Sequence, residues 1–309
     1  MPAYHIDTPI SSDTLPPLAA AIWRTVAYAD VFDYPLTMAE IHRYLDGEAA
    51  SLPLVQATLC AGGPLARYVV PADAHYYTLL GRESLVAVRQ ERLRVWQALW
   101  PEAEGYGRIL AALPFVRMVA VTGSLAVGNA ERGADIDYLI VTENGRLWLC
   151  RAFTIAVVRL AARRGITLCP NYFLSQRALE FADHNLYVAR EVTQMVPLFG
   201  GATYRSLRQC NAWTETYLPN AVGPPRSLLP QSKPTAWLQT VTELPLRTPL
   251  GTAVEQWEMQ RKIRKFKTLP CSLAEINFSP DHCKGHFHGH NQRIITAYHK
   301  RVDGFNLPE

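Results

Sequence analysis

The chain has 309 residues, 49% of them hydrophobic and 19% charged, which is the composition of an ordinary globular protein with material for two or three packed units. Its net charge of +4 suits an anionic ligand such as a nucleotide but is too small to indicate nucleic-acid binding. The 6 scattered cysteines include no CxxC pair, and no apolar stretch is long and uncharged enough to span a bilayer. These features exclude a disulfide scaffold and a membrane partner, and they predict a cytoplasmic protein without a signal peptide.

The first predicted region, residues 1–100, has the element order of a winged helix, in which three helices precede a hairpin. The expected helices lie at residues 15–29, 37–45, 51–61 and 82–100, and the expected strands at 65–70 and 75–80. Thr37 and Glu40 form a capping-box sequence, in which each side chain accepts a backbone N–H at the start of the second helix. The region is therefore predicted to be a winged-helix-like domain.

A winged helix makes a DNA-binding regulator one alternative function for the chain. The expected recognition helix, residues 51–61, contains neither Lys nor Arg, and contacts to nucleic-acid phosphates depend on those residues. We therefore favour a module that contacts protein or shapes a substrate site. Nucleic acid is the less favoured partner.

The second predicted region, residues 101–220, alternates helices and strands. The expected helices lie at residues 103–113 and 146–163, and the expected strands at 116–122, 138–142 and 166–175. Strand, helix and strand in succession predict a mixed α/β sheet. The helix at 146–163 is apolar apart from a few arginines, so we expect it to be buried, with Arg151 and Arg159 reaching toward water.

Two aspartates, Asp135 and Asp137, stand one residue apart just before an apolar strand. Side chains at i and i+2 of a strand share a face, so both carboxylates are expected to converge while Ile136 faces the opposite layer. Two carboxylates that close together repel each other unless a cation joins them. The pair therefore predicts a site for a divalent cation that prefers oxygen ligands, Mg²⁺ or Mn²⁺, completed by phosphate oxygens.

Gly123 and Ser124 follow an apolar strand and are expected to open a helix. Glycine lets the backbone approach a phosphate closely, the N–H groups at a helix start favour an anion, and the serine hydroxyl adds a donor. A phosphate-binding turn beside a metal-binding carboxylate pair predicts a site for a nucleotide.

This segment resembles the nucleotidyltransferase superfamily typified by DNA polymerase beta, and it looks closest to the branch of antibiotic and minimal nucleotidyltransferases. The resemblance covers residues 105–200 and lies in Gly123-Ser124, Gly128 and Asp135-Ile-Asp137, which stand in the family's order and spacing. It implies that Asp135 and Asp137 are catalytic and bind Mg²⁺, and that the two glycines and the serine bind the triphosphate. It further implies in-line attack of an acceptor hydroxyl on the α-phosphate of an NTP, with pyrophosphate leaving. The sequence does not indicate the acceptor.

The family also uses a third carboxylate on a later strand, as a metal ligand or as the base. The residue expected at that position is Asn171, which can ligate a metal through its carbonyl oxygen but cannot accept a proton. Glu180, Asp183 and Glu191 are candidates to replace it from a neighbouring element. Asn171 motivates a second hypothesis, a nucleotide-binding regulatory protein with weak or no catalysis.

The third predicted region, residues 221–309, is a C-terminal extension made of a linker and helices. The breaker-rich stretch Pro219–Pro234 predicts a linker or an extended wrap, and a helix is expected at residues 253–267. We interpret the basic run at 261–267 as the solvated side of that helix rather than as a clamp for an anionic acceptor. We interpret the histidines and cysteine in 282–290 as a surface loop rather than a zinc site, because two glycines interrupt them.

Overall fold

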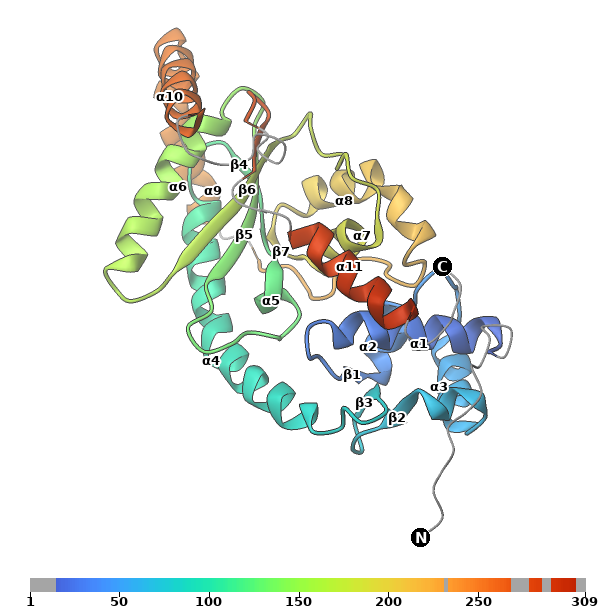
Figure 1. The fold of residues 1–309 in the computed structure, drawn as a ribbon. Helices are drawn as coiled ribbons and strands as arrows, with labels where there is room; N and C mark the ends of the chain where they lie inside the picture. The colour runs from blue at the N-terminus through green and yellow to red at the C-terminus, as the bar shows by residue number, and fades with distance from the viewer. Residues whose placement is uncertain (1–14, 231–232, 268–277, 285–289, 304–309) are drawn as a thin grey trace.

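Two β-sheets and the helices packed on them make up a mixed α/β fold, as expected from the sequence (Figure 1). We describe it from a computed structural model, which covers residues 15–230, 233–267, 278–284 and 290–303. Among these residues, the smaller sheet has three strands in the order β1-β3-β2, and the larger has five in the order β7-β4-β5-β6-β8. The long helix α4 (Leu85–Ala111) joins the two sheets along the chain.

The N-terminal part packs its helices against the small sheet. Its elements are α1 (Pro17–Asp30), β1 (Leu36–Thr37), α2 (Met38–Arg43), α3 (Leu52–Cys60), β2 (Val69–Pro71) and β3 (Tyr76–Leu79). The expected capping box is present, with Glu40 N–H donating to Thr37 Oγ1 (3.2 Å) and Thr37 N–H donating to Glu40 Oε2 (2.8 Å). The strand expected at 65–70 is shorter, because Pro64–Arg67 forms a 3-10 turn after two glycines.

The structure corrects the expectation of separate helices at 82–100 and 103–113. Helix α4 runs unbroken through this stretch, with Pro101 inside it. A proline removes one intrahelical hydrogen bond, but the turns after it are held by packing, because Tyr106 and Leu110 are buried in the core of the large sheet. The chain therefore passes from the N-terminal part to the large sheet through one continuous helix.

The large sheet carries the candidate site. Its strands are β4 (Val116–Val121), β5 (Ile136–Thr142), β6 (Leu168–Ser175), β7 (Val196–Phe199) and β8 (His282–Lys284). The β5–β6 pair is parallel and the other three pairs are antiparallel. Parallel neighbours need a crossover connection, and α6 (Leu147–Ala162) supplies it.

Helices cover both faces of the large sheet, as the alternation of its strand residues requires (Figure 1). Val119 and Val121 pack on one face with α4 and α6, whereas Met118 and Ala120 pack on the other. The second face is covered by α7 (Leu186–Gln194) and α8 (Gly201–Cys210), which a 3-10 turn (Ala212–Thr216) follows. The core of the sheet therefore lies in two layers, and the ends of its strands are left for a site.

Helix α6 is less buried than the sequence suggested. Its first turn is enclosed, with Trp148 and Cys150 fully buried, but Leu160 is 52% exposed. Glu255 caps the buried end, because its carboxylate accepts the N–H groups of Trp148 (2.9 Å) and Leu149 (2.7 Å). A carboxylate at a helix start satisfies free N–H groups and faces the positive end of the helix dipole.

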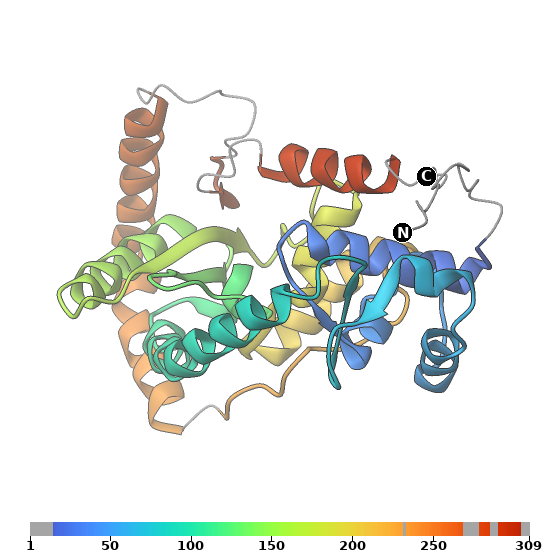
Figure 2. The same ribbon diagram turned by 60° about the horizontal axis from the view of Figure 1, so that its bottom comes forward.

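The C-terminal segment returns to both earlier parts of the chain. Its helical elements are α9 (Lys233–Glu243), the 3-10 turn Leu244–Arg247, α10 (Pro249–Lys267) and α11 (His290–Asp303). Helix α10 lies against α6 with Ile263 packed on the sheet core, while Arg261, Arg264 and Lys265 are exposed, as expected for an amphipathic helix. Helix α11 lies against α1 (Figure 2). Tyr298 of α11 donates to Asp46 (2.9 Å), and Arg301 donates to Asp30 at the end of α1 (2.8 Å).

The histidine-rich tail departs from the expected loop where it is described. His282 and Cys283 lie in β8, which pairs with β6, and His286 and His288 lie outside the described residues. Across the described part of the chain, the cysteines are free thiols and no helix is both long and apolar enough to cross a membrane.

Candidate functional site

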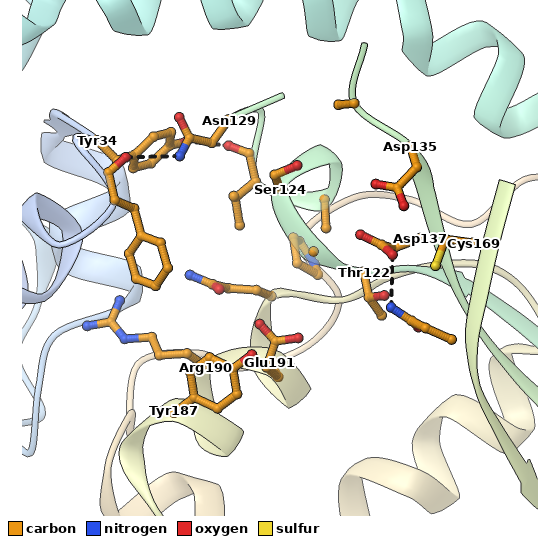
Figure 3. Close-up of a pocket in the computed structure, with 18 of the residues that line it drawn as sticks. Tyr34, Thr122, Ser124, Asn129, Asp135, Asp137, Cys169, Tyr187, Arg190 and Glu191 are labelled. Atoms are coloured by element: carbon orange, nitrogen blue, oxygen red, sulfur yellow. Dashed lines mark hydrogen bonds between the residues drawn. The ribbon is translucent and has the colours of Figure 1, made fainter. Parts of the chain in front are cut away.

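The two predicted aspartates converge at the start of strand β5 (Figure 3). Asp135 precedes the strand and Asp137 lies in it, while Ile136 between them is fully buried in the opposite layer. Cys169 stands beside Asp137 in the register of the parallel strand β6. One ligand atom from each of Asp135, Asp137 and Cys169 lies within 4.8 Å of the others, which is the one such cluster among the described residues. The structure thus brings together the carboxylate pair that the sequence predicted and adds a thiol.

Gly123 lies against Asp137, in a backbone conformation that favours glycine. Its φ is +65°, and a Cβ at this position would stand 2.4 Å from Asp137 Oδ2. The residue opens the short helix α5 (Gly123–Ala126) directly after β4, as expected. Ser124 follows it and lines the same cavity as the aspartates (Figure 3). The turn and the carboxylates therefore form one site.

Gly128, which the family resemblance associates with the nucleotide, has a different position. Its φ is +73°, and a Cβ there would reach only Leu93 and Trp96 of α4, each at 4.0 Å. It is absent from the described residues that line the cavity. Its observed contribution is the backbone turn that leads from α5 toward the aspartates.

No basic side chain of the described residues pairs with the two carboxylates. Among the described residues, neither aspartate has an arginine or lysine at ion-pair distance. Burial, together with the charge of Asp135, raises the pKa of Asp137 to about 7. Burial and the two aspartates raise the pKa of Cys169 to about 12, so its thiol stays protonated. The two carboxylates offer the oxygen ligands that a hard divalent cation prefers.

The candidates for the third polar residue of the site differ in whether they line the cavity. Asn171 lies on β6, and its Nδ2 donates to Asp137 Oδ1 (2.8 Å), so it orients that carboxylate. Glu180 and Asp183 are exposed and do not line the cavity. Glu191, on α7, lines the cavity opposite the aspartates (Figure 3). Burial and the nearby Asp137 raise the pKa of Glu191 to about 7.

These groups share a cavity of about 1390 Å³ between the N-terminal helices and the large sheet. Typical small-molecule sites enclose roughly 300–1,000 Å³, so the cavity has room for a nucleotide and a second molecule. The N-terminal part lines it with aromatic side chains, Tyr28, Phe32, Tyr34 and Tyr44. Sequence reasoning did not find these residues or Arg190, because only the fold brings them to the aspartates.

The loop between Gly128 and Asp135 is held by the N-terminal part. Tyr34 Oη donates to the carbonyl of Val127, and Arg92 donates to Asn129 Oδ1 (3.1 Å) and Glu131 Oε1 (2.5 Å). Asn129 Nδ2 in turn donates to the carbonyl of Phe32 (3.3 Å). The N-terminal part therefore forms a wall of the site.

No family model, curated protein or solved structure matches the chain. The functional argument therefore rests on the geometry and chemistry of the site.

Proposed function

We propose that the protein is a metal-dependent nucleotidyltransferase that transfers a nucleoside monophosphate from an NTP to a hydroxyl group of an acceptor. The observation that carries the proposal is the close approach of Gly123 to Asp137, because it brings a turn suited to phosphate binding next to a carboxylate pair in one cavity. A nucleoside triphosphate needs both features, a close backbone approach to its phosphates and a cation for their charge.

The arrangement of elements supports the nucleotidyltransferase fold as part of this proposal. The Gly-Ser turn follows β4, the aspartates begin the neighbouring β5, and β6 lies parallel to β5. We include a winged-helix-like N-terminal module in the proposal, since its helices and its β1-β3-β2 sheet follow that order. Its proposed role is to complete the site, because its residues line the cavity.

Asp135 and Asp137 would hold Mg²⁺ or Mn²⁺, which supplies charge neutralisation to the phosphate oxygens when bound. Asn171 fixes the carboxylate of Asp137, and the Gly123-Ser124 turn offers N–H and hydroxyl donors to the triphosphate. These groups position the α-phosphate for in-line attack.

We propose Glu191 as the base, because it lines the cavity opposite the aspartates. The acceptor oxygen forms a bond to the α-phosphorus, the bond from that phosphorus to pyrophosphate breaks, and the acceptor proton passes to the Glu191 carboxylate. A base with a pKa near 7 combines a large ionised fraction with a useful proton affinity at neutral pH. Glu191 therefore supplies the proton acceptor that Asn171 cannot.

A nucleotide-binding regulatory protein is the second candidate function, and Asn171 favours it. Its side chain donates to Asp137 at the β6 position where the family has a carboxylate. In this case the cavity binds NTP and metal without turnover. The third candidate, a DNA-binding regulator, has less support, because α3 exposes Leu52 and Leu54 and contains no basic residue.

The deciding experiment is transfer from NTPs labelled at the α-phosphate, with Mg²⁺ or Mn²⁺ and a cell extract as the source of acceptor. We expect label on an acceptor with the wild type and none with Asp135→Asn/Asp137→Asn. The matched control, Glu180→Gln/Asp183→Asn, removes two exposed carboxylates and should transfer as the wild type does. Transfer by the aspartate double variant contradicts the proposal, and metal-dependent NTP binding without transfer by the wild type selects the regulatory function.

A further inference from the structure

Arg190 is a buried cation in the wall of the cavity. It is 2% exposed, and its guanidinium lies 4.6 Å from the ring centroid of Tyr28 and 5.3 Å from that of Tyr44. One terminal nitrogen donates to the carbonyl of Tyr44 (2.9 Å), and Nε has no hydrogen-bond partner. Within the described part of the chain, no carboxylate forms an ion pair with it.

A buried charge of this kind is costly unless an opposite charge compensates it. Stacking on the tyrosine rings offsets part of this cost, since a cation on an aromatic face gains roughly 0.5–2 kcal/mol. The neighbouring acid Asp46 is already engaged, because it accepts from Tyr298 (2.9 Å) and pairs with Arg24 (3.4 Å). Arg190 thus brings an unpaired charge and an unsatisfied N–H to the cavity wall, and an anionic ligand would compensate the charge.

The position of Arg190 separates it from the nucleotide phosphates. It extends from α7 toward the N-terminal helices, whereas Glu191, the next residue, lies between it and Asp137 (Figure 3). A molecule anchored on Arg190 thus reaches Glu191 before it reaches the carboxylate pair. Such an order suits an acceptor, whose hydroxyl must lie between the base and the α-phosphate.

We propose that Arg190 and the tyrosines around it form the acceptor subsite, and that the acceptor is a small hydroxyl compound carrying a carboxylate or phosphate group. The proposal rests on the transferase function above. A small molecule fits, because a cation that is only 2% exposed has to be reached by a group that enters the cavity. Arginine suits such an anion, since it can offer two parallel N–H donors to it.

The charge of the acceptor can be tested before its identity is known. A cell extract is passed through a small-pore filter, and the filtrate is divided on a strong anion exchanger at neutral pH. Each fraction is then incubated with wild-type protein, Mg²⁺ and α-labelled NTP. We expect label on a compound from the retained, anionic fraction. Label on a compound from the flow-through, or on macromolecules held by the filter, overturns the inference but leaves the transferase function in place. No label in any fraction contradicts the transferase function itself.

The role of Arg190 is tested with the labelled fraction as substrate. We expect Arg190→Met to raise the KM for the acceptor roughly 10- to 100-fold, as the loss of a charge-assisted hydrogen bond implies, and to leave the KM for NTP unchanged. Arg190→Lys keeps the charge, so its KM for the acceptor should lie between those of the wild type and Arg190→Met. The matched control is Arg208→Met on α8, because Arg208 also donates to a backbone carbonyl (Ala221, 3.1 Å) but lies outside the cavity.

A purely structural arginine gives a different result. In that case Arg190→Met lowers the thermal unfolding midpoint and changes both KM values or neither, as Arg208→Met does. Arg190→Lys provides the same comparison if the methionine variant does not fold. An unchanged acceptor KM in a folded Arg190 variant overturns the inference.

Discussion

The two ends of strand β5 carry acidic residues in opposite surroundings. At its start, Asp135 and Asp137 face Glu191 across the cavity without an ion-pair partner among the described residues. Glu143 just after its end and Glu243 of α9 share two arginines: Arg247 bonds to Glu143 (2.8 Å) and Glu243 (2.6 Å), and Arg117 bonds to both acids. The same sheet thus holds a compensated and an uncompensated acidic cluster.

The pKa values follow this difference. Burial alone would raise the pKa of Glu143 and Glu243, but the hydrogen bonds from Arg247 and Arg117 hold both below their ordinary range. At the cavity end burial outweighs the hydrogen bond from Cys169 and the charge of Lys284, and the pKa values of Asp137 and Glu191 are both raised to about 7. Acids with arginine partners stabilise the fold, whereas we propose that a ligand completes the charge balance at the acids that repel one another.

The largest expected effect is on activity at the cavity end. Glu191→Gln should lower the rate of transfer roughly 10²–10⁴-fold, because it removes the proton acceptor. Metal-dependent NTP binding should persist, because Asp135, Asp137 and the Gly123 turn are unchanged. Glu143→Gln at the other end of β5 is the control and should transfer at nearly the wild-type rate. Comparable losses in the two variants would show that the difference between the ends has no bearing on catalysis.

The next effect is on stability at the compensated end. Glu243→Gln should lower the free energy of unfolding by about 2–4 kcal/mol, since it leaves buried donors and arginine charges short of a partner. One of those donors is the N–H of Phe115 (2.8 Å), whose φ of +64° is rare for a residue with a side chain. Denaturant unfolding at neutral pH measures the loss.

The pH dependence of this loss has a definite sign. The folded pKa of Glu243 lies below its ordinary value of 4.5, so the carboxylate stabilises the fold fully above that pH. The contribution disappears as the pH falls through the folded pKa. The difference in the free energy of unfolding between the wild type and Glu243→Gln should therefore narrow below about pH 4.5. A difference that does not depend on pH would show that the ion pairs are not its source.

The parts of the site that the sequence predicted are those set by local geometry. Asp135 and Asp137 converge because residues at i and i+2 share a strand face, and Gly123 meets them because β4 and β5 are neighbours. Glu191 could be named only as one of three acids, since its place depends on how α7 packs on the sheet. No sequence pattern indicated a binding role for Arg190, because its separation from carboxylates results from the fold.

The fold shows the same limit. Capping and periodicity located α1, α2 and α3, whose boundaries depend on nearby residues. Helix α4 was split wrongly at Pro101, where tertiary packing outweighs the local cost of proline. Strand β8 was expected to be a loop, but it pairs with β6, a long-range contact without a local sequence signal.

The smallest expected effect is a gain in the free energy of unfolding, opposite in sign to the loss expected for Glu243→Gln. In metal-free protein, Asp137→Asn should raise the free energy of unfolding by about 1 kcal/mol near neutral pH, since it removes a buried charge beside Asp135 and still accepts from Asn171. The folded pKa of Asp137 is about 7 against an ordinary 3.8, so the wild type loses this stability as the pH rises through that window. The advantage of the variant should be absent near pH 3.8 and complete above pH 7.

Mg²⁺ sharpens the comparison, because it should restore the missing charge balance only where both carboxylates are present. We expect Mg²⁺ to raise the thermal unfolding midpoint of the wild type at neutral pH and to have little effect on Asp137→Asn. The order of stability would then be variant above wild type without metal, with the gap closing or reversing as Mg²⁺ is added. If metal-free Asp137→Asn is less stable than the wild type at neutral pH, then another group balances the charge of Asp137 in the wild type. The two ends of β5 would then not differ in charge compensation.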